Sequence, residues 1–258
     1  MLAVHRINPP SATSCTLVSK HWRKICYCSY NDGIRDLNDL SRNSTLTSND
    51  VTMEPYLQMI VLGVTGSIAM GKSTVAAMLS TLNIPIHDAD KTVHKLFNKN
   101  GEAYHRLVKI FPEAEVADGI DRAKLGQEVF GKPAKLKQLE NLLHPLVRKA
   151  RDEFIKKQNR YKTKLIILDV PLLYETGGDK ICDKVLVVSA PFFIQRQRAL
   201  SRKGMTQEKF FDILKRQLPD HEKRKRADFI LPTGLGKAYT YRTLKRMVRD
   251  LKNRAVKC

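Results

Sequence analysis

The chain lacks any long apolar run. Although 42% of its 258 residues are apolar, no run reaches the ~18–20 residues that a membrane-spanning helix needs. Its longest candidates, Met59–Val64 and Leu165–Leu173, have the length of β-strands. We therefore expect a soluble protein with no membrane partner, long enough for one large domain or two small ones.

Cysteine is also scarce, and no two cysteines form a C-x-x-C pair. The five are Cys15, Cys26, Cys28, Cys182 and Cys258. Cys26 and Cys28, together with nearby histidines, could form a metal site, but unpaired thiols explain the spacing more simply. An odd number of cysteines and the absence of a secretory signal favour a reducing, cytoplasmic location.

Acidic residues are few relative to basic ones. The chain has 46 Lys and Arg against 26 Asp and Glu, a net charge of +20. Residues 191–258 hold nineteen basic and six acidic residues, so they carry much of the surplus. Such a surplus needs an anionic partner or a solvated surface. Nucleic acid, a membrane surface and a polyphosphate substrate all qualify, and charge alone does not choose among them.

Residues 1–58 differ in composition from the rest of the chain. They are rich in Ser, Thr, Asn and Asp and show no sustained hydrophobic period. We interpret them as an extension outside the core domain of residues 59–258, either disordered or the product of a misassigned start, with Met53 or Met59 as the true one. A targeting peptide is the alternative, but the acidic residues and the lack of an Arg-rich amphipathic face argue against a mitochondrial signal.

From Met59 onward, apolar strand-like segments alternate with helical patterns. We expect strands over Ile60–Val64, Ile84–Ile86, Leu165–Val170, Lys184–Ser189 and Phe229–Leu231. We expect helices over Ser73–Leu82, Phe192–Ser201, Gln207–Gln217 and Tyr239–Lys252, with residues 91–160 mostly helical and interrupted at Pro112, Gly119 and Pro133. This alternation predicts a three-layer α/β fold around a mostly parallel sheet.

The segment Gly66–Ser73 (GSIAMGKS) fits the phosphate-loop motif G-x-x-x-x-G-K-[ST]. The glycines let the backbone turn so that successive N–H groups point at phosphates, and the following helix directs its positive end to the same place. Lys72 is expected to reach the β- and γ-phosphates of ATP, Ser73 to supply a hydroxyl to Mg²⁺, and Thr74 to bond the α-phosphate. The ATP-binding residues predicted from this loop are Gly66, Ala69, Met70, Gly71, Lys72, Ser73 and Thr74, whereas Gly63 and Thr65 are expected to serve packing or turns.

Three carboxylates follow predicted strands. Asp169 ends an apolar strand, where a carboxylate that holds Mg²⁺ is expected, although a strand-end Asp can also cap a turn. Asp88 and Asp90 follow the second strand at the edge where ligands bind in open α/β sheets. Either could receive a hydroxyl proton or hold metal-bound water, and either could cap the next helix.

Two arginines late in the chain could act on a phosphate. Arg198 and Arg202 are four residues apart and share one helix face, in a helical pair at about 191–226 that lies where small kinases carry a mobile lid. A solvated basic face is the alternative. For the run Lys223–Arg226 (KRKR), an exposed face is favoured over a role near phosphates.

Several blocks in a fixed order resemble the dephospho-coenzyme A kinase family. The resemblance covers about Met59 to Tyr241. The matching blocks are Gly63–Thr74 (GVTGSIAMGKST), Asp88–Asp90 (DAD), Asp118–Phe130 (DG.DR..L...VF), Leu139–Val147 (LE...HP.V), Val170–Gly177 (VPLLYETG), Gln195 with Arg198 and Arg202, and Gln217 with Arg226, Ala227 and Asp228. The DAD, HP and VPLL blocks are the specific ones, because many kinases share the phosphate loop.

This resemblance implies a P-loop kinase that uses ATP and Mg²⁺ to phosphorylate the ribose 3′-hydroxyl of dephospho-coenzyme A, the last step of coenzyme A synthesis, in the cytoplasm. It implies that Asp90 receives the hydroxyl proton, with Asp88 as the alternate, and that Arg198 is the lid cation on the transferring phosphate. It also implies that the helices from about 91 to 160 bind the acceptor, with His144 and Pro145 at their base.

The chain departs from the family pattern in two places. Ala69 and Met70 stand between the loop glycines where smaller residues are usual, and Pro232–Thr233 stands where an Asn near the adenine is usual. The alternatives are another small-molecule kinase, acting on a nucleoside or a sugar, and a P-loop regulator that binds nucleic acid through the basic C-terminal half. A kinase with two polyphosphate ligands and no nucleic-acid partner is favoured, since a regulator would have no use for the DAD and VPLL blocks.

Overall fold

The computed structural model of the chain describes residues 59–129 and 131–254. The interpretation of residues 1–58 as an extension therefore lies outside the described residues.

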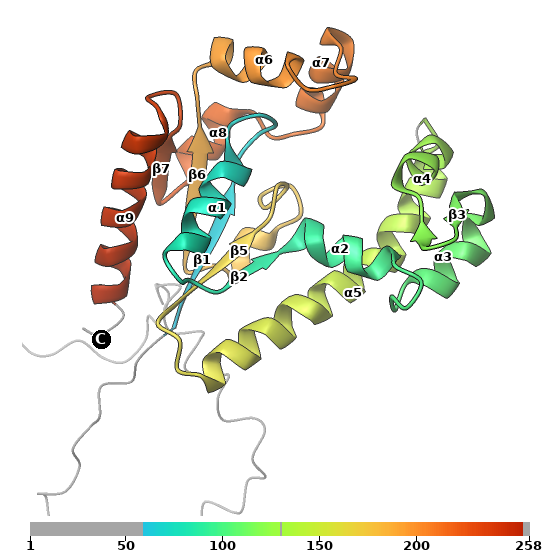
Figure 1. Ribbon diagram of the computed structural model, residues 1–258, viewed down its shortest axis with the longest axis horizontal. Coiled ribbons are helices and arrows are strands. Elements are labelled where there is room, and N and C mark those ends of the chain that lie inside the picture. Colours follow the sequence, from blue (N-terminus) through green and yellow to red (C-terminus); the bar gives the residue numbers. More distant parts are fainter. Residues whose placement is uncertain (1–58, 130, 255–258) are drawn as a thin grey trace, which may run out of the picture. The chain divides into compact units, whose positions relative to one another are not determined.

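A five-stranded parallel sheet forms the centre of the described chain (Figure 1), in the order β2-β5-β1-β6-β7. Its strands are β1 (Ile60–Thr65), β2 (Ile86–Asp88), β5 (Leu165–Asp169), β6 (Lys184–Ser189) and β7 (Phe229–Pro232). The sheet confirms the predicted α/β fold. Every residue of β5 is buried, because a parallel sheet is covered on both faces and its central strands need apolar side chains on both.

Helices cover both faces of this sheet. On one face, α1 (Lys72–Thr81) and α9 (Lys237–Arg254) pack their apolar sides against the strands. On the other face, Phe154 and Ile155 of α5 (Pro133–Arg160) pack near Ile166 and Leu168 of β5. Strand order changes direction at β1, so the loop after β1 opens at the sheet edge where ligands bind in such folds.

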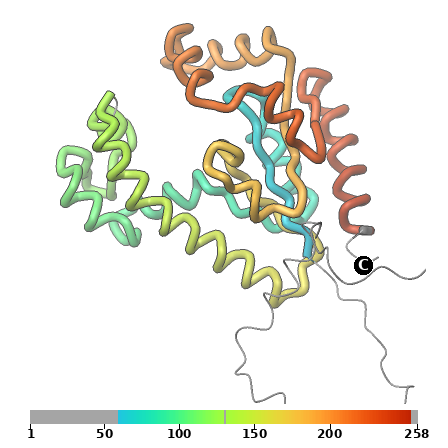
Figure 2. Tube along the Cα trace, turned by 180° about the vertical axis from the view of Figure 1, so that it is seen from behind, coloured from blue at the N-terminus to red at the C-terminus, as the bar shows by residue number. Residues whose placement is uncertain are grey.

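The region that was expected to be mostly helical has a hydrophobic core of its own. It contains α2 (Ala89–Phe97), α3 (Tyr104–Ile110), the 3₁₀ turn η3 (Pro112–Ala114), the strands β3 (Glu115–Val116) and β4 (Gly119–Ile120), α4 (Arg122–Val129) and the first half of α5. Side chains such as Phe97, Leu107, Phe111 and Leu143 fill this core. Figure 2 shows α5 as one long helix that links this region to the sheet.

The helical stretch is interrupted at Gly119, as predicted, but by a short antiparallel hairpin, β3–β4, that was not predicted and that the φ of +143° at Gly119 suits. The prediction for the second strand needs correction. The second strand begins at Ile86 rather than Ile84, because Pro85 has no N–H for the ladder and only its carbonyl bonds, to the Ile167 amide. Ile84 is buried in the core, so its apolar character resembles that of a strand residue.

The late helical segment holds three helices where two were expected. They are α6 (Phe192–Leu200), α7 (Gln207–Lys215) and α8 (Asp220–Arg226). A separate 3₁₀ turn, η4 (Gly178–Ile181), lies earlier in the chain, between β5 and β6. Helix α8 was missed because seven mostly charged residues show no apolar period. None of the helices in the described ranges is long and apolar enough to cross a membrane.

Candidate active site

The phosphate loop joins β1 to α1, as the motif predicted. Gly71 has a φ of +96°, a conformation that favours glycine. A Cβ on Gly66 would lie 2.7 Å from the Val188 carbonyl oxygen, so a larger residue would push the loop away from β6. Gly63 packs against Cys182 and Leu173, and the Thr65 hydroxyl donates to the Pro171 carbonyl at 2.9 Å, which supports packing roles for both.

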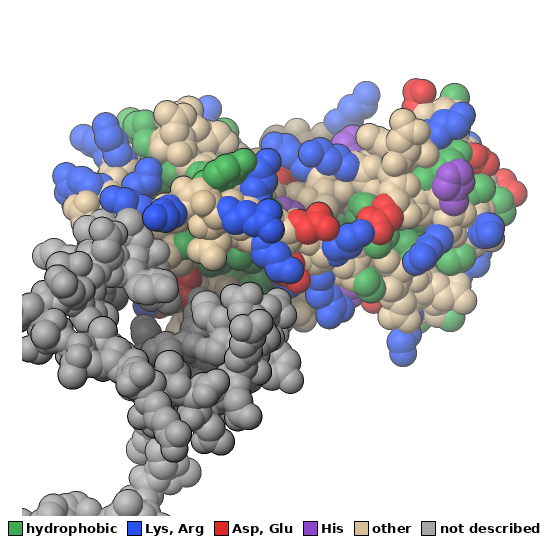
Figure 3. Space-filling view, turned by 90° about the horizontal axis from the view of Figure 1, so that it is seen from below, with side chains coloured by type: hydrophobic (Ala, Val, Ile, Leu, Met, Phe, Trp, Pro, Cys, Tyr) green, Lys and Arg blue, Asp and Glu red, His purple; other side chains and the backbone are tan. Residues whose placement is uncertain are grey.

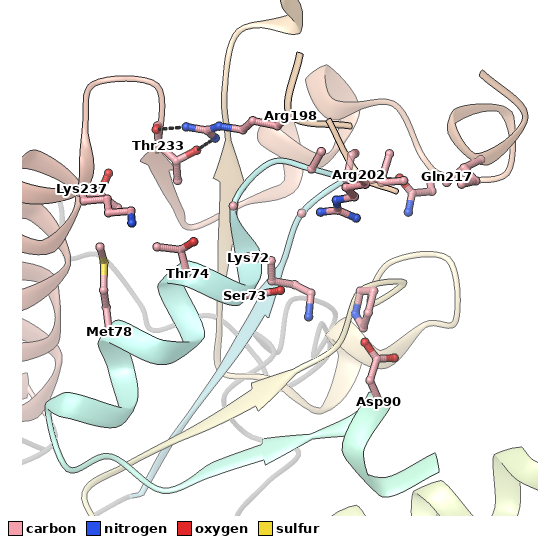
Figure 4. Close-up of a pocket in the computed structure, with 18 of the residues that line it drawn as sticks. Lys72, Ser73, Thr74, Met78, Asp90, Arg198, Arg202, Gln217, Thr233 and Lys237 are labelled. Carbon is pink, nitrogen blue, oxygen red and sulfur yellow. Dashed lines mark hydrogen bonds between the residues drawn. The ribbon is translucent and has the colours of Figure 1, made fainter. Parts of the chain in front are cut away.

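A cavity of about 530 Å³ opens at this loop (Figure 4). Its lining includes most of the predicted site residues, namely Gly66, Ala69, Gly71, Lys72, Ser73, Thr74, Asp90, Arg198 and Arg202. Met70, Asp88 and Asp169 do not line it. Met70 is buried instead, and its sulfur accepts a hydrogen bond from the Ala190 amide at 3.1 Å.

Lys72 and Asp169 form an ion pair beside the loop. The Lys72 Nζ lies 2.8 Å from the Asp169 Oδ1, and the aspartate is almost fully buried at the end of β5. Burial raises the pKa of Asp169, the attraction of Lys72 opposes that rise, and Asp88 and Asp90 add to it. The register of β2 and β5 explains the nearby acids, because Asp88 pairs with Asp169 across the ladder.

The two candidate bases differ in their surroundings. Asp88 ends β2 and caps α2, with its Oδ1 accepting from the Lys91 amide at 3.0 Å, so the capping alternative holds for this residue. Asp90 lies one residue into α2, is exposed, and lines the cavity. In Figure 4 its carboxylate points toward the space below Lys72.

The two candidate arginines also differ in their surroundings. The Arg198 guanidinium donates to Thr233 twice, to its hydroxyl oxygen at 3.0 Å and to its carbonyl oxygen at 2.8 Å. Arg202 is exposed at the rim of the cavity, and in Figure 4 its guanidinium turns toward Lys72 and the phosphate loop. Arg198 lies on α6 and is bonded to the residue that follows β7, whereas Arg202 lies two residues beyond the end of α6, so the predicted shared helix face is not formed.

The basic run Lys223–Arg226 is not a uniform exposed face. Lys223 is fully buried, with its Nζ 2.9 Å from the Glu175 Oε1 and 3.5 Å from the Pro171 carbonyl oxygen. The exposed-face interpretation is wrong for this lysine and right for the three residues after it. Burial raises the pKa of Glu175, but hydrogen bonds from Lys223 and from the Leu218 amide outweigh burial, so that pKa lies below its usual value.

Three residues near the loop had no predicted role. Thr233, where the family pattern has an Asn, donates from its hydroxyl to the Met70 carbonyl at 2.6 Å. Gln195 and Gln217 bond the backbone of Ile68 in the loop. The sequence signalled the glutamines only as members of the family blocks, because their partner lies more than 120 residues away.

The basic surplus is spread out on the face of the molecule that Figure 3 displays. Lys and Arg side chains lie there among acidic and other side chains rather than in a single block.

The protein oxygens near the loop could supply part of the coordination shell of a Mg²⁺ ion. Ser73 is the second residue of α1, next to Lys72, and Asp169 forms an ion pair with that lysine. Within residues 59–129 and 131–254, no three His, Cys, Asp or Glu side chains are grouped to hold a metal by themselves. This pattern suits Mg²⁺, which usually keeps several waters and binds through one or two protein oxygens plus substrate phosphates.

Comparisons with known proteins identify the family of the chain. A family model described as dephospho-CoA kinase matches residues 60–235. The dephospho-CoA kinase of Mesorhizobium japonicum is 50% identical over 178 residues, which cover 69% of this chain and 89% of that protein. That of Rhodospirillum rubrum is 48% identical over 187 residues, 72% of this chain and 89% of that one. The solved structure of dephospho-CoA kinase from Campylobacter jejuni is 27% identical, covers 74% of this chain and 96% of its own, and has a TM-score of 0.54. This chain therefore belongs to the dephospho-CoA kinase family.

Proposed function

We propose that the chain transfers the γ-phosphoryl group of ATP to the ribose 3′-hydroxyl of dephospho-coenzyme A, giving coenzyme A and ADP. Membership of the family supports the reaction. The observation that carries the assignment of the site is the cavity at the phosphate loop, which brings together Lys72, Asp90 and two lid arginines from distant parts of the chain.

The phosphates of ATP lie, in this proposal, along the backbone of Gly66–Thr74. The N–H groups at the start of α1 and the Lys72 ammonium offset the charge of the β- and γ-phosphates. Asp169 holds that ammonium beside the loop through the 2.8 Å ion pair. Mg²⁺, when bound through Ser73 with Asp169 nearby, supplies further positive charge to the phosphate oxygens.

The lid supplies the remaining cations. The family resemblance implies Arg198 as the cation on the transferring phosphate, but the two bonds of Arg198 to Thr233 support a different assignment. We assign Arg202 to the transferring phosphate, and we assign Arg198 to holding the lid helix against the end of β7. A lid closed over this loop also keeps water from competing with the acceptor hydroxyl.

Asp90 is the proposed base. Its carboxylate lines the cavity, whereas the Asp88 carboxylate is engaged as a helix cap. Asp90 orients the acceptor 3′-hydroxyl and receives its proton as the oxygen attacks. The helical region with its own core at 89–150 then binds the rest of the acceptor, and we propose that the reaction takes place in the cytoplasm.

The test is an assay of ADP formation with the purified protein, ATP, Mg²⁺ and dephospho-coenzyme A. Replacing Asp90 with Asn should lower kcat by ~10²-fold or more and spare ATP binding. Asp88→Asn keeps an oxygen that can cap α2, so it should lose far less. Rapid phosphorylation of a nucleoside or sugar beside no turnover of dephospho-coenzyme A would contradict the proposed reaction, and a dead Asp88→Asn with a nearly normal Asp90→Asn would reverse the assignment of the base.

A further inference from the structure

Two glutamines of the lid bond the same residue of the phosphate loop. Gln195 lies on α6, is 3% exposed, and donates through its Nε2 to the Ile68 carbonyl oxygen at 2.9 Å. Gln217 lies just after α7, and its Oε1 accepts from the Ile68 N–H at 2.9 Å. Both backbone groups of Ile68 are therefore bonded to side chains from either end of the α6–α7 pair.

The next loop residue is in a conformation that usually needs glycine. Ala69 has a φ of +61°, which is unfavourable for a residue with a Cβ unless its surroundings hold it there. Its methyl group is buried with Ala199 of α6 and Phe210 of α7. The lid thus contacts the loop at this turn through both packing and hydrogen bonds.

The bond from Gln195 also sets the direction of a loop N–H. In a trans peptide the C=O and the N–H point in opposite directions. Fixing the Ile68 carbonyl toward Gln195 therefore fixes the Ala69 N–H away from it, and Ala69 lines the cavity. Since loop N–H groups bind phosphates, their direction bears on ATP affinity.

We propose that Gln195 and Gln217 are positioning residues, which hold Ile68 and Ala69 in the turn that binds phosphate and so couple the docking of the lid to the binding of ATP. The inference rests on the proposed assignment of this cavity to ATP. It also explains how Ala69 can replace a smaller residue, because contacts with the lid supply the constraint that a glycine would not need.

The two glutamines have opposite hydrogen-bonding tasks, which gives a sharp test. Gln195 must donate, so neither Met nor an ionised Glu can replace it. Gln217 must accept, so Glu can keep its bond and Leu cannot. Gln197, an exposed glutamine on the same helix as Gln195, offers a matched control as Gln197→Met.

The first experiment measures steady-state kinetics for both substrates. We expect Gln195→Met to raise KM for ATP by about tenfold, the effect of losing one hydrogen bond that orders the loop, with KM for dephospho-coenzyme A changed by less than about twofold. Gln195→Glu should lose at least as much. An ATP KM for Gln195→Met equal to that of Gln197→Met, or a parallel rise in both KM values, would overturn the proposal.

The second experiment measures hydrogen exchange of the Ile68 amide by NMR, without any substrate. Protection should be lost in Gln217→Leu and kept in Gln217→Glu; equal protection in the two variants would refute the role of Gln217. Because this measurement needs no turnover, it still tests the hydrogen bond from Ile68 to Gln217 if the proposed reaction is wrong. That failure would appear separately, as a wild-type protein that does not phosphorylate dephospho-coenzyme A.

Discussion

The buried pair of Lys223 and Glu175 predicts an asymmetric loss of stability. Replacing Glu175 with Met leaves a fully buried ammonium with only the Pro171 carbonyl oxygen, 3.5 Å away, among the partners described above. Removing one partner of a buried pair costs about 3–5 kcal/mol. Replacing Lys223 with Met should cost only about 1 kcal/mol, because the Glu175 side chain is 18% exposed and keeps the Leu218 amide at 2.8 Å.

The same reasoning gives a dependence on pH. A stranded ammonium can escape by losing its proton, which for an ordinary lysine side chain costs about 4.6 kcal/mol at pH 7 and about 1.9 kcal/mol at pH 9. The penalty of Glu175→Met should therefore shrink by about 1–2 kcal/mol between these two pH values. The penalty of Lys223→Met should not change, since that variant strands no lysine.

Urea unfolding followed by circular dichroism at pH 7 and pH 9 measures these quantities. The double variant, which strands no charge, should resemble Lys223→Met rather than lose as much as both single variants together. Equal losses for the two single variants, or a loss in Glu175→Met that is the same at both pH values, would refute the reasoning.

Three further predictions concern other parts of the chain. Lys72→Ala should abolish phosphoryl transfer while leaving the circular dichroism spectrum unchanged; residual transfer within tenfold of wild type would contradict the role of this lysine. A chain that begins at Met59 should match the full chain in activity and melting temperature, and lost activity would show that the preceding residues are part of the enzyme. Burial, chiefly, and then Arg151 hold the pKa of His87 below its usual value of 6.5, so the folded state binds fewer protons at that ring than the unfolded state. The stability that neutral His87 contributes is therefore present above pH 6.5 and is lost as the pH falls through the lowered pKa of the folded state. The melting temperature of His87→Phe should therefore fall less than that of the wild type between pH 7 and pH 5. Equal falls in the two proteins would contradict this.

Much of the fold could be predicted because it depends on local patterns. Parallel strands buried on both faces need apolar runs, and such runs at 60–64, 165–170 and 184–189 predicted β1, β5 and β6. Short elements escaped prediction for equally local reasons. The β3–β4 hairpin has two residues in each strand, and α8 has no apolar side chain.

The relation between the candidate bases depended on tertiary contacts. The residue pattern placed Asp88 and Asp90 together at the end of the second strand, and only the family resemblance favoured Asp90 over Asp88. Asp88 lies at the N-cap position of α2, so its carboxylate caps that helix. Asp90 lies two residues later, and the fold around the cavity places its side chain in the lining. Likewise, the spacing of Arg198 and Arg202 predicted a shared helix face, but α6 ends at Leu200, and only the fold brings Thr233, the residue after β7, to Arg198.

The sequence by itself determined that this protein has a phosphate loop on a parallel α/β sheet and that its blocks match one kinase family. Those properties depend on residues that are consecutive in the chain, so the residue types of a loop such as Gly66–Ser73 are enough to predict its conformation. The tertiary structure alone decided that Lys223 is buried against Glu175 and that the side chains of Gln195 and Gln217 form hydrogen bonds with the backbone of Ile68. The physical reason is the same for both: hydrogen bonds and ion pairs between residues far apart in the chain are fixed by packing, which leaves no local pattern to read.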